Sequence, residues 1–475
     1  MSASSNVLTV APADEAAEIV VTDADLNPVA QGVGRFQREL PAGLYKIRVR
    51  VGPKVEEQLV SLDRDREVSI GALEFPSPIP LVGTSRNSGE HRAAAIASSM
   101  AVRATFGTGA SVFVFAREWT RPGDGTDGAA SLRETGANPA AGLSLRDDSG
   151  ARLATIAGPA DSPGKGDPAV GWRADLAPGP YRLRLELDDG YMQERSLFAA
   201  PNCQTQIFLL QRDHGLSDGS VQRRPDLLGA TVTISRKGKF DPNDRQIRLS
   251  EIACYALAQH RHILSDDLLD ELLNGKFDDP VLGLAGAHLM LRDHPEDDQR
   301  FRIVTDNLLR LLGPDHPDLR ALWLARSDRS GIPDVRLVSP PMLRASWDLG
   351  VQKSVESADI IPTGTSCSEI ADRILPTAPW LLWRAEHVTV TEAVHRLNAK
   401  LAAVHSYLGA RAAADAPPAT GLRRFAQSLP IISRYFLSRA DGTAAELSPQ
   451  EKAELARTLG VPGHLLDAML KRLAP

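Results

Sequence analysis

The chain has 475 residues, of which 43% are hydrophobic and 24% charged, so it can bury sizeable cores and is not globally disordered. This length predicts roughly three domains. The 54 Lys and Arg residues are outnumbered by 60 Asp and Glu residues, and the resulting net charge of −6 argues against nucleic acid as a partner.

The cysteines and the N-terminus both favour the cytoplasm. Cys203, Cys254 and Cys367 are odd in number and far apart, which matches neither a disulfide framework nor a paired metal site. Residues 1–6 lack the basic and then apolar stretches of a signal peptide. No apolar run approaches the ~18–20 residues of a membrane span. We therefore expect a cytoplasmic chain without a membrane partner.

Residues 1–80 are predicted to form a first β-sandwich module. Apolar residues alternate with Lys46, Arg48 and Arg50 along residues 44–51, which is the period of a strand with one buried and one exposed face. The turn sequence Leu-Pro-Ala-Gly at residues 40–43 precedes this strand.

The same pattern recurs later in the chain. Apolar residues alternate with Arg182, Arg184 and Glu186, after the turn sequence Leu-Ala-Pro-Gly at residues 176–179. Downstream, Glu-Gln-Leu-Val at residues 57–60 corresponds to Glu-Arg-Ser-Leu at residues 194–197. One β-sandwich fold is therefore expected twice. The second copy spans residues 102–212 with long loops, follows a helical linker at 81–101, and contains a fully buried strand at 110–119.

This turn, followed by Gly-x-Tyr and alternating apolar residues, resembles the transthyretin-like and carboxypeptidase-regulatory-like β-sandwiches. The resemblance implies a binding or spacer module, because folds of this kind carry many functions. It implies no catalytic residue. A carbohydrate-binding module is an alternative that the resemblance leaves open.

After a connector at residues 213–245, the hydrophobic period changes to that of helices. Leu249, Ile252 and Ala256 share one helical face, and further helices are predicted at 280–291, 296–312 and 318–325. We divide this half into an α-helical domain at 246–330 and an α-helical C-terminal region at 331–475. The predicted fold class is a multidomain chain with two antiparallel β-sandwich modules followed by an all-α helical-hairpin region.

Residues 279–291, 341–348 and 379–383 resemble segments of a family of uncharacterised bacterial proteins that tend to occur near caspase-like or CHAT proteases. The resemblance implies that such a protease is a partner in a bacterial multi-protein defence system. In that case Arg223 and Arg224, in the predicted connector, are candidate cleavage sites.

Two apolar clusters are candidate protein-binding sites. A docking surface needs them exposed, whereas packing in the core needs no partner. The sequence around the C-terminal cluster also resembles a DNA-binding helix-turn-helix. However, its second helix has few side chains that could form hydrogen bonds with the edges of DNA bases. The two clusters are Trp380, Leu381 and Trp383, and Leu465, Leu466 and Met469.

No catalytic, cofactor-binding or metal-binding residue is predicted. Two histidines at 260 and 262 would face different directions on a helix, and Cys367 at a predicted helix start has no identifiable His partner. The Asp-His-Pro sequences at 293–295 and 315–317 suit helix starts better than acid–base sites. Phosphate-loop and nucleophile-elbow sequences are absent.

The composition and motifs together favour a non-catalytic adaptor or scaffold that binds other proteins. An enzyme of a class without a short sequence signature remains the alternative, and a homo-oligomer is left open.

Overall fold

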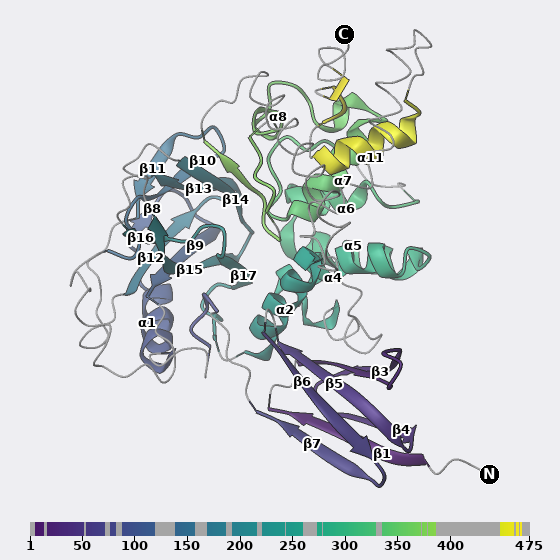
Figure 1. The fold of residues 1–475 in the computed structure, drawn as a ribbon. Coiled ribbons are helices and arrows are strands. Elements are labelled where there is room, and N and C mark those ends of the chain that lie inside the picture. The colour runs from purple at the N-terminus through teal and green to yellow at the C-terminus, as the bar shows by residue number, and fades with distance from the viewer. Residues whose placement is uncertain are drawn as a thin grey trace.

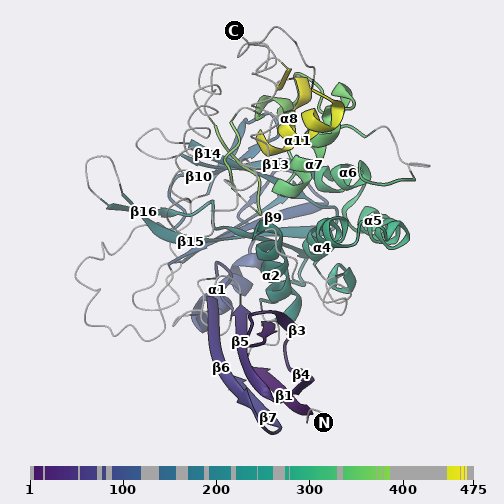
Figure 2. The ribbon, with the colours of Figure 1, turned by 45° about the vertical axis from the view of Figure 1, so that its right-hand side comes forward.

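The computed structural model of the chain describes most of residues 5–385 together with residues 447–467. The longest gaps within these ranges are 119–137, 157–168 and 260–272. Figures 1 and 2 show the first seven strands projecting from the rest of the molecule, where the remaining sheets lie beside the helices.

The first seven strands, here called the first module, form two sheets over one apolar core. The three-stranded sheet has the order β4-β1-β7 and the four-stranded sheet the order β3-β2-β5-β6. Both sheets contribute to the core, with Leu8 and Val10 from one and Ile47 and Val49 from the other. The strands are β1 (Ser5–Pro12), β2 (Glu18–Thr22), β3 (Pro28–Val33), β4 (Phe36–Pro41), β5 (Gly43–Val51), β6 (Lys54–Leu62) and β7 (Arg66–Ile70).

The next strands build two larger sheets, here called the second module. One sheet has the order β11-β10-β13-β14-β18, and the other has the order β16-β15-β9-β12-β8 with β17 also on β15. Their bounds are β8 (Ala104–Thr105), β9 (Ala110–Arg117), β10 (Leu143–Asp147), β11 (Arg152–Thr155), β12 (Ala169–Leu176), β13 (Gly179–Glu186), β14 (Met192–Ala199), β15 (Cys203–Gly215), β16 (Val221–Pro225), β17 (Thr231–Arg236) and β18 (Leu382–Arg384).

The two modules share one pairing scheme. Strand β1 pairs antiparallel with β4 and parallel with β7, and β9 pairs antiparallel with β12 and parallel with β15. Strand β5 lies antiparallel between β2 and β6, as β13 lies between β10 and β14. The strands predicted from the alternation at 44–51 and 181–187 are therefore present and occupy equivalent positions.

A tyrosine fixes the turn before each of these two strands. The Tyr45 hydroxyl donates a hydrogen bond of 2.8 Å to the carbonyl of Pro41, and the Tyr181 hydroxyl donates one of 3.0 Å to the carbonyl of Ala177. Each bond spans four residues and ties the strand back to the turn that precedes it, as in the tyrosine corner of immunoglobulin-like sheets.

Strand β9 is buried on both faces, as its run of Val and Phe predicted. Val112 and Val114 face the main core, whereas Phe113 and Phe115 face a smaller core beneath helix α1 (Ser88–Met100). The helix packs closely because β12 carries a glycine at residue 171, where a Cβ atom would lie 2.2 Å from the Cβ of Ser98.

The helices of the second half pack onto the second module. Helix α4 is almost wholly buried and contacts α2, α5, α6 and strand β17, and its apolar residues belong to the same core as β9 and β12. The bounds are α2 (Arg245–Gln259), α4 (Pro280–Asp293), α5 (Asp298–Leu312), α6 (Pro317–Trp323), α7 (Arg344–Ser354), the 3-10 helix η2 (Ala358–Ile360), α8 (Ser366–Glu369) and α11 (Pro449–Leu459).

The predicted fold class is wrong. Two of the four sheets are mixed rather than antiparallel, because β1–β7 in one and β9–β15 and β8–β12 in the other are parallel pairs. The C-terminal region is not all-α, because β18 extends the sheet of β14. The predicted connector contributes β16 and β17 to the other sheet. One core joins strands and helices, so two β-sandwiches followed by a separate all-α region do not describe the chain.

Candidate functional site

The outer face of β13 and β14 is covered by the C-terminal region. Strand β18 pairs antiparallel with β14 and places Trp383 opposite Glu194 and Leu382 opposite Arg195. The hydroxyl of Ser196 donates a hydrogen bond of 2.6 Å to the carbonyl of Pro340. Segments distant in sequence from β14 thus cover both its outer face and the edge that does not pair with β13.

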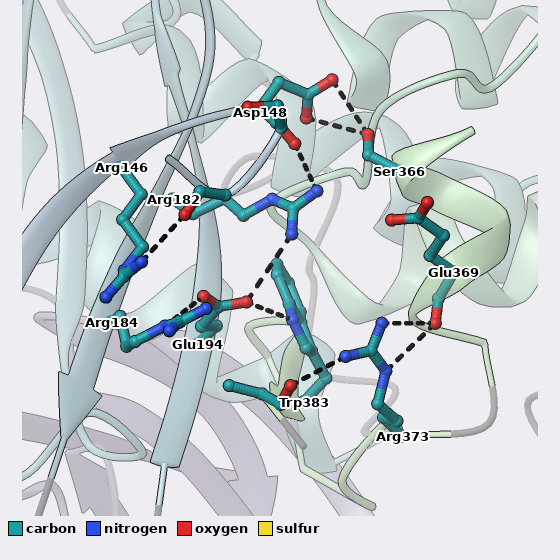
Figure 3. A network of polar contacts seen from close by, with 12 residues as sticks. Arg146, Asp148, Arg182, Arg184, Glu194, Ser366, Glu369, Arg373 and Trp383 are labelled. Carbon is teal, nitrogen blue, oxygen red and sulfur yellow. Dashed lines mark hydrogen bonds and ion pairs between the residues drawn. The ribbon is translucent and has the colours of Figure 1, made fainter. Parts of the chain in front are cut away.

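Glu194 lies at the centre of this covered face (Figure 3). Its carboxylate accepts hydrogen bonds from Arg184 Nε at 2.5 Å and from Trp383 Nε1 at 2.9 Å. The guanidinium of Arg182 lies 3.7 Å from the same carboxylate, and 1% of the Glu194 side chain is exposed. A buried carboxylate needs such partners, because an unpaired one would cost several kcal/mol.

A second acid, Asp148, ties the C-terminal region to the turn after β10. Its carboxylate accepts hydrogen bonds from the hydroxyls of Ser339 at 2.8 Å and Ser366 at 2.9 Å, and its backbone carbonyl accepts one from Arg182. Arg373 lies farther along the interface and bonds the carbonyls of Glu369 and Ala385. The C-terminal region is therefore attached to the second module by polar contacts as well as by β18.

The first module carries the same trio of charges at equivalent positions. Arg48 lies opposite Glu57 in the β5–β6 ladder, as Arg184 lies opposite Glu194 in the β13–β14 ladder. Arg48 Nε donates to Glu57 at 2.7 Å, and Lys46 Nζ lies 2.6 Å from the other carboxylate oxygen. Hydrogen bonds from Lys46 and Arg48 hold the pKa of Glu57 below its ordinary value.

In the first module this trio is open to solvent. The exposed fraction of the Glu57 side chain is 39%, against 1% for Glu194. Among the residues that the structure describes, β6 pairs only with β5, whereas its counterpart β14 pairs with β13 and β18.

Apolar side chains adjoin the exposed ion pairs. Leu59 is 68% exposed and lies opposite Lys46, and Val55 and Leu44 are also exposed. We call this surface the β5–β6 face, formed by Leu44, Lys46, Arg48, Val55, Glu57 and Leu59.

This surface was not predicted as a site from the sequence. The predicted correspondence of residues 57–60 with residues 194–197 is in register with the structure. The contact of each glutamate with two cations could not be predicted from a common spacing. Arg48 and Glu57 are 9 positions apart in the sequence, whereas Arg184 and Glu194 are 10 positions apart. The similarity of residues 57–60 to residues 194–197 was the only feature of the sequence that pointed to this surface.

The predicted aromatic cluster lies in the interior. Trp380, Leu381 and Trp383 are at most 2% exposed. The Trp380 ring packs in the main core with the guanidinium carbon of Arg195 5.0 Å from its centroid, whereas Leu381 and Trp383 pack in a second core with α7 and α11. In the free chain these side chains are unavailable to a partner unless β18 leaves the sheet.

Of the predicted C-terminal cluster, Leu466 is 1% exposed and packs in the second core. Leu465 and Met469 lie outside the described residues, as do the histidines at 260 and 262.

Neither predicted cleavage residue lies in a loop. Arg223 and Arg224 belong to β16, which pairs antiparallel with β15. Arg223 is exposed and forms an ion pair with Glu118, whereas Arg224 is buried. Both residues are therefore held in a strand at the edge of the sheet rather than in an unpaired connector.

One buried cluster has the residue types of a nucleophilic site but not their order. His288 Nε2 lies 2.7 Å from Ser346 Oγ, and Ser346 also bonds Asp318, so the serine stands between the histidine and the acid. Activation of a serine needs the histidine in the middle. Asp318 instead accepts hydrogen bonds of 2.8 Å from the backbone N–H groups of Met342 and Leu343.

Titration also fits a structural role for this cluster. Burial lowers the pKa of His288 to about 3 and raises the pKa of Asp318 to about 6. A histidine that stays neutral at pH 7 can serve as a hydrogen-bond donor to Ser346 without any proton transfer. The cluster therefore anchors the start of α7.

The other polar residues that the sequence had raised and not assigned as sites also lie in structural surroundings. Cys367 is fully buried, which raises the pKa of its thiol and opposes a thiolate nucleophile. His294 lies 3.8 Å from Glu296, and His316 is buried against the Phe198 ring. Within the described ranges, no group of three or more His, Cys, Asp or Glu side chains could hold a metal ion.

Comparison with known proteins assigns no family. No protein-family model matches the sequence, and none of the curated proteins matches it. In the part of the chain that the structure describes, no helix combines the length and the apolar character that crossing a bilayer requires.

Proposed function

We propose that the protein is a non-catalytic adaptor and that the β5–β6 face of its first module binds another protein. The observation that carries the proposal is the contrast between two equivalent surfaces. The trio around Glu194 is covered by β18 and the segments beside it, whereas the trio around Glu57 is exposed.

The β5–β6 face has the composition of a binding surface. Exposed Leu44, Val55 and Leu59 supply apolar area, and Glu57 with its two cations supplies directional polar contacts beside them. Scattered exposed apolar residues are common on protein surfaces, but these three lie on neighbouring strands at an open sheet edge. An open edge presents unpaired backbone groups that another chain can bind.

The attachment of the module supports the same proposal. Its apolar core is separate from the three cores of the rest of the described chain, and it projects from the molecule (Figures 1 and 2). A projecting module can meet a partner without disturbing the helices. The second module, the helices and the C-terminal region then form the platform of the adaptor.

Site-specific photo-cross-linking in the native host tests the proposal. A photo-reactive residue replaces Leu59 on the β5–β6 face, and in a control chain it replaces the exposed Arg38 on β4 of the other sheet. We expect position 59, but not position 38, to form a discrete adduct with one host protein. The same adducts from both positions, or none from position 59, would contradict the proposal.

A variant distinguishes specific binding from proximity. Leu59→Glu places a charge among the apolar residues of the face, and Arg38→Glu adds the same charge on the other sheet. Purification of tagged chains should recover the cross-linked protein with the wild type and with Arg38→Glu but lose it with Leu59→Glu. Equal recovery with both variants would remove the β5–β6 face as the binding surface.

We further propose a caspase-like or CHAT protease of the same host as the first partner to test. The resemblance of residues 279–291, 341–348 and 379–383 to proteins found near such proteases supports this choice. The two purified proteins are mixed and analysed by size-exclusion chromatography. Co-elution that Leu59→Glu abolishes would support the choice, and separate elution would exclude this partner while leaving the adaptor proposal in place.

A further inference from the structure

The second module shows how a strand can occupy the edge of this kind of sheet. Strand β18 lies antiparallel to β14 over three residue pairs, with Trp383 opposite Glu194. The indole N–H then donates to the Glu194 carboxylate, and the Arg182 guanidinium carbon lies 6.0 Å from the centroid of the Trp383 ring. A cation at this distance from an aromatic face is attracted to it.

The first module offers the same features at the edge of β6. Glu57 stands where Glu194 stands, and Lys46 and Arg48 stand where Arg182 and Arg184 stand. The carboxylate of Glu57 retains capacity for a further donor, because a carboxylate has about four acceptor positions. The edge of β6 carries no further strand among the described residues.

One difference between the modules indicates which side chain a segment bound at the β6 edge must carry. Ser196 bonds the carbonyl of Pro340, but the equivalent residue in the first module is the exposed Leu59. A segment on β6 must therefore bring an apolar side chain over Leu59 where the second module has a polar contact.

A second copy of the chain is a poor occupant of this edge. Self-pairing would bring Glu56 and Glu57 of both chains along one seam, and like charges on facing strands oppose pairing. Another protein with a neutral or donor-bearing strand avoids this repulsion.

We infer that the β6 edge binds an extended segment of a partner protein, added antiparallel to β6, with a tryptophan that donates its indole N–H to Glu57. The inference rests on the proposed adaptor function and specifies how the partner is held. The backbone ladder supplies affinity, and the charged side chains around Glu57 supply specificity, as side-chain contacts do in other cases of strand addition.

The test uses the full-length chain and a labelled synthetic peptide with the sequence of residues 377–388, which contains the strand that covers β14. Binding is measured by fluorescence anisotropy to the wild type, to Glu57→Gln, and to Glu67→Gln. Glu67 is the matched control, because it pairs with Arg35 on the other sheet of the same module and is also exposed. A second peptide replaces the residue equivalent to Trp383 with alanine.

We expect saturable binding to the wild type and to Glu67→Gln, and a loss of roughly ten-fold or more in affinity with Glu57→Gln or with the alanine peptide, because each removes a charge-assisted hydrogen bond. Binding that both changes leave intact, or the absence of saturable binding, would overturn the inference. A concentration-dependent dimer that Leu59→Glu abolishes would also overturn it, in favour of a second copy.

The inference and the adaptor proposal can fail separately. A host protein cross-linked at position 59 while the peptide does not bind would keep the adaptor and remove strand addition. Specific peptide binding without any cross-linked host protein would keep strand addition at β6 and remove the adaptor proposal.

Discussion

The contrast between the two glutamates predicts a large difference in their contribution to stability. The change is Glu→Gln, made once at Glu194 and once at Glu57, so the chemistry of the substitution is identical. Glutamine at 194 can still accept from Trp383, but Arg182 and Arg184 lose their buried counter-charge. Removing one partner of a buried ion pair costs about 3–5 kcal/mol.

The lower end of that range applies to Glu194→Gln. Arg184 is 18% exposed and keeps part of its hydration, so we expect a loss of about 3 kcal/mol in the free energy of unfolding. At Glu57 the carboxylate and Arg48 are exposed and Lys46 is half-buried, so water can solvate all three groups after the change. We expect no measurable loss there.

Guanidinium unfolding measures the difference, followed by tryptophan fluorescence for Glu194→Gln and by far-UV circular dichroism for Glu57→Gln. The 6 tryptophans of the chain lie between residues 119 and 383, so fluorescence reports on the second module and the helices. A loss of about 3 kcal/mol should lower the midpoint by ~0.5–1 M. Glu57→Gln should leave the curve unchanged. Equal shifts for both variants, or none for Glu194→Gln, would refute the assignment of Glu194 as a buried charge centre.

Three further predictions concern the two modules and their packing. Tyr45→Phe and Tyr181→Phe should each cost ~1 kcal/mol in unfolding free energy. The loss from Tyr181→Phe should shift the fluorescence midpoint, and the loss from Tyr45→Phe should shift the midpoint followed by circular dichroism. No shift for either variant would contradict the role of its hydroxyl as a turn anchor. Gly171→Ala should lower stability by about 1–3 kcal/mol because its Cβ meets Ser98 in α1, and a thermal midpoint equal to the wild type would contradict that packing. Glu251 lies in α2, and its carboxylate accepts hydrogen bonds from the hydroxyls of Ser77 and Thr231. Burial raises its pKa from 4.5 to about 7, so its contribution to stability is present below about pH 4.5 and is lost as pH rises through about 7. Relative to Glu251→Gln, the wild type should lose ~3 kcal/mol over that interval in pH-dependent unfolding, and parallel curves would contradict it.

Local sequence patterns predicted those elements whose burial is periodic. The alternation around Tyr45 and Tyr181 predicted β5 and β13. The apolar run at 110–119 predicted a fully buried strand, which the structure has as β9 at 110–117. The helical period predicted α2, α4 and α5. In each case one face, or both, is dictated by neighbours along the chain.

Non-local pairing could not be predicted in this way. The run Pro-Trp-Leu-Leu-Trp at 379–383 has no period, so it does not distinguish a helix from the three-residue strand β18. Its partner β14 is almost two hundred residues away, and nothing near either segment in the sequence indicates that they pair. The parallel pairs β1–β7 and β9–β15 are non-local for the same reason.

The candidate site depended on the same non-local information. The sequence showed matching phrases around Glu57 and Glu194, but both looked like ordinary solvated strand faces. Only the structure shows that β18 and the segments beside it cover one of them and that the other is open. The contrast, rather than either surface alone, identifies the β5–β6 face.

Hydrogen exchange of the full-length chain, with and without the peptide of residues 377–388, tests the central claim most directly. In the free chain the amides of β6, paired on one side, should exchange faster than those of β14, which is paired on both. Addition of the peptide should slow exchange in residues 54–62 and leave β7 unchanged. Unchanged exchange in β6, or protection confined to β14, would contradict the claim that β6 is the edge at which a partner strand binds.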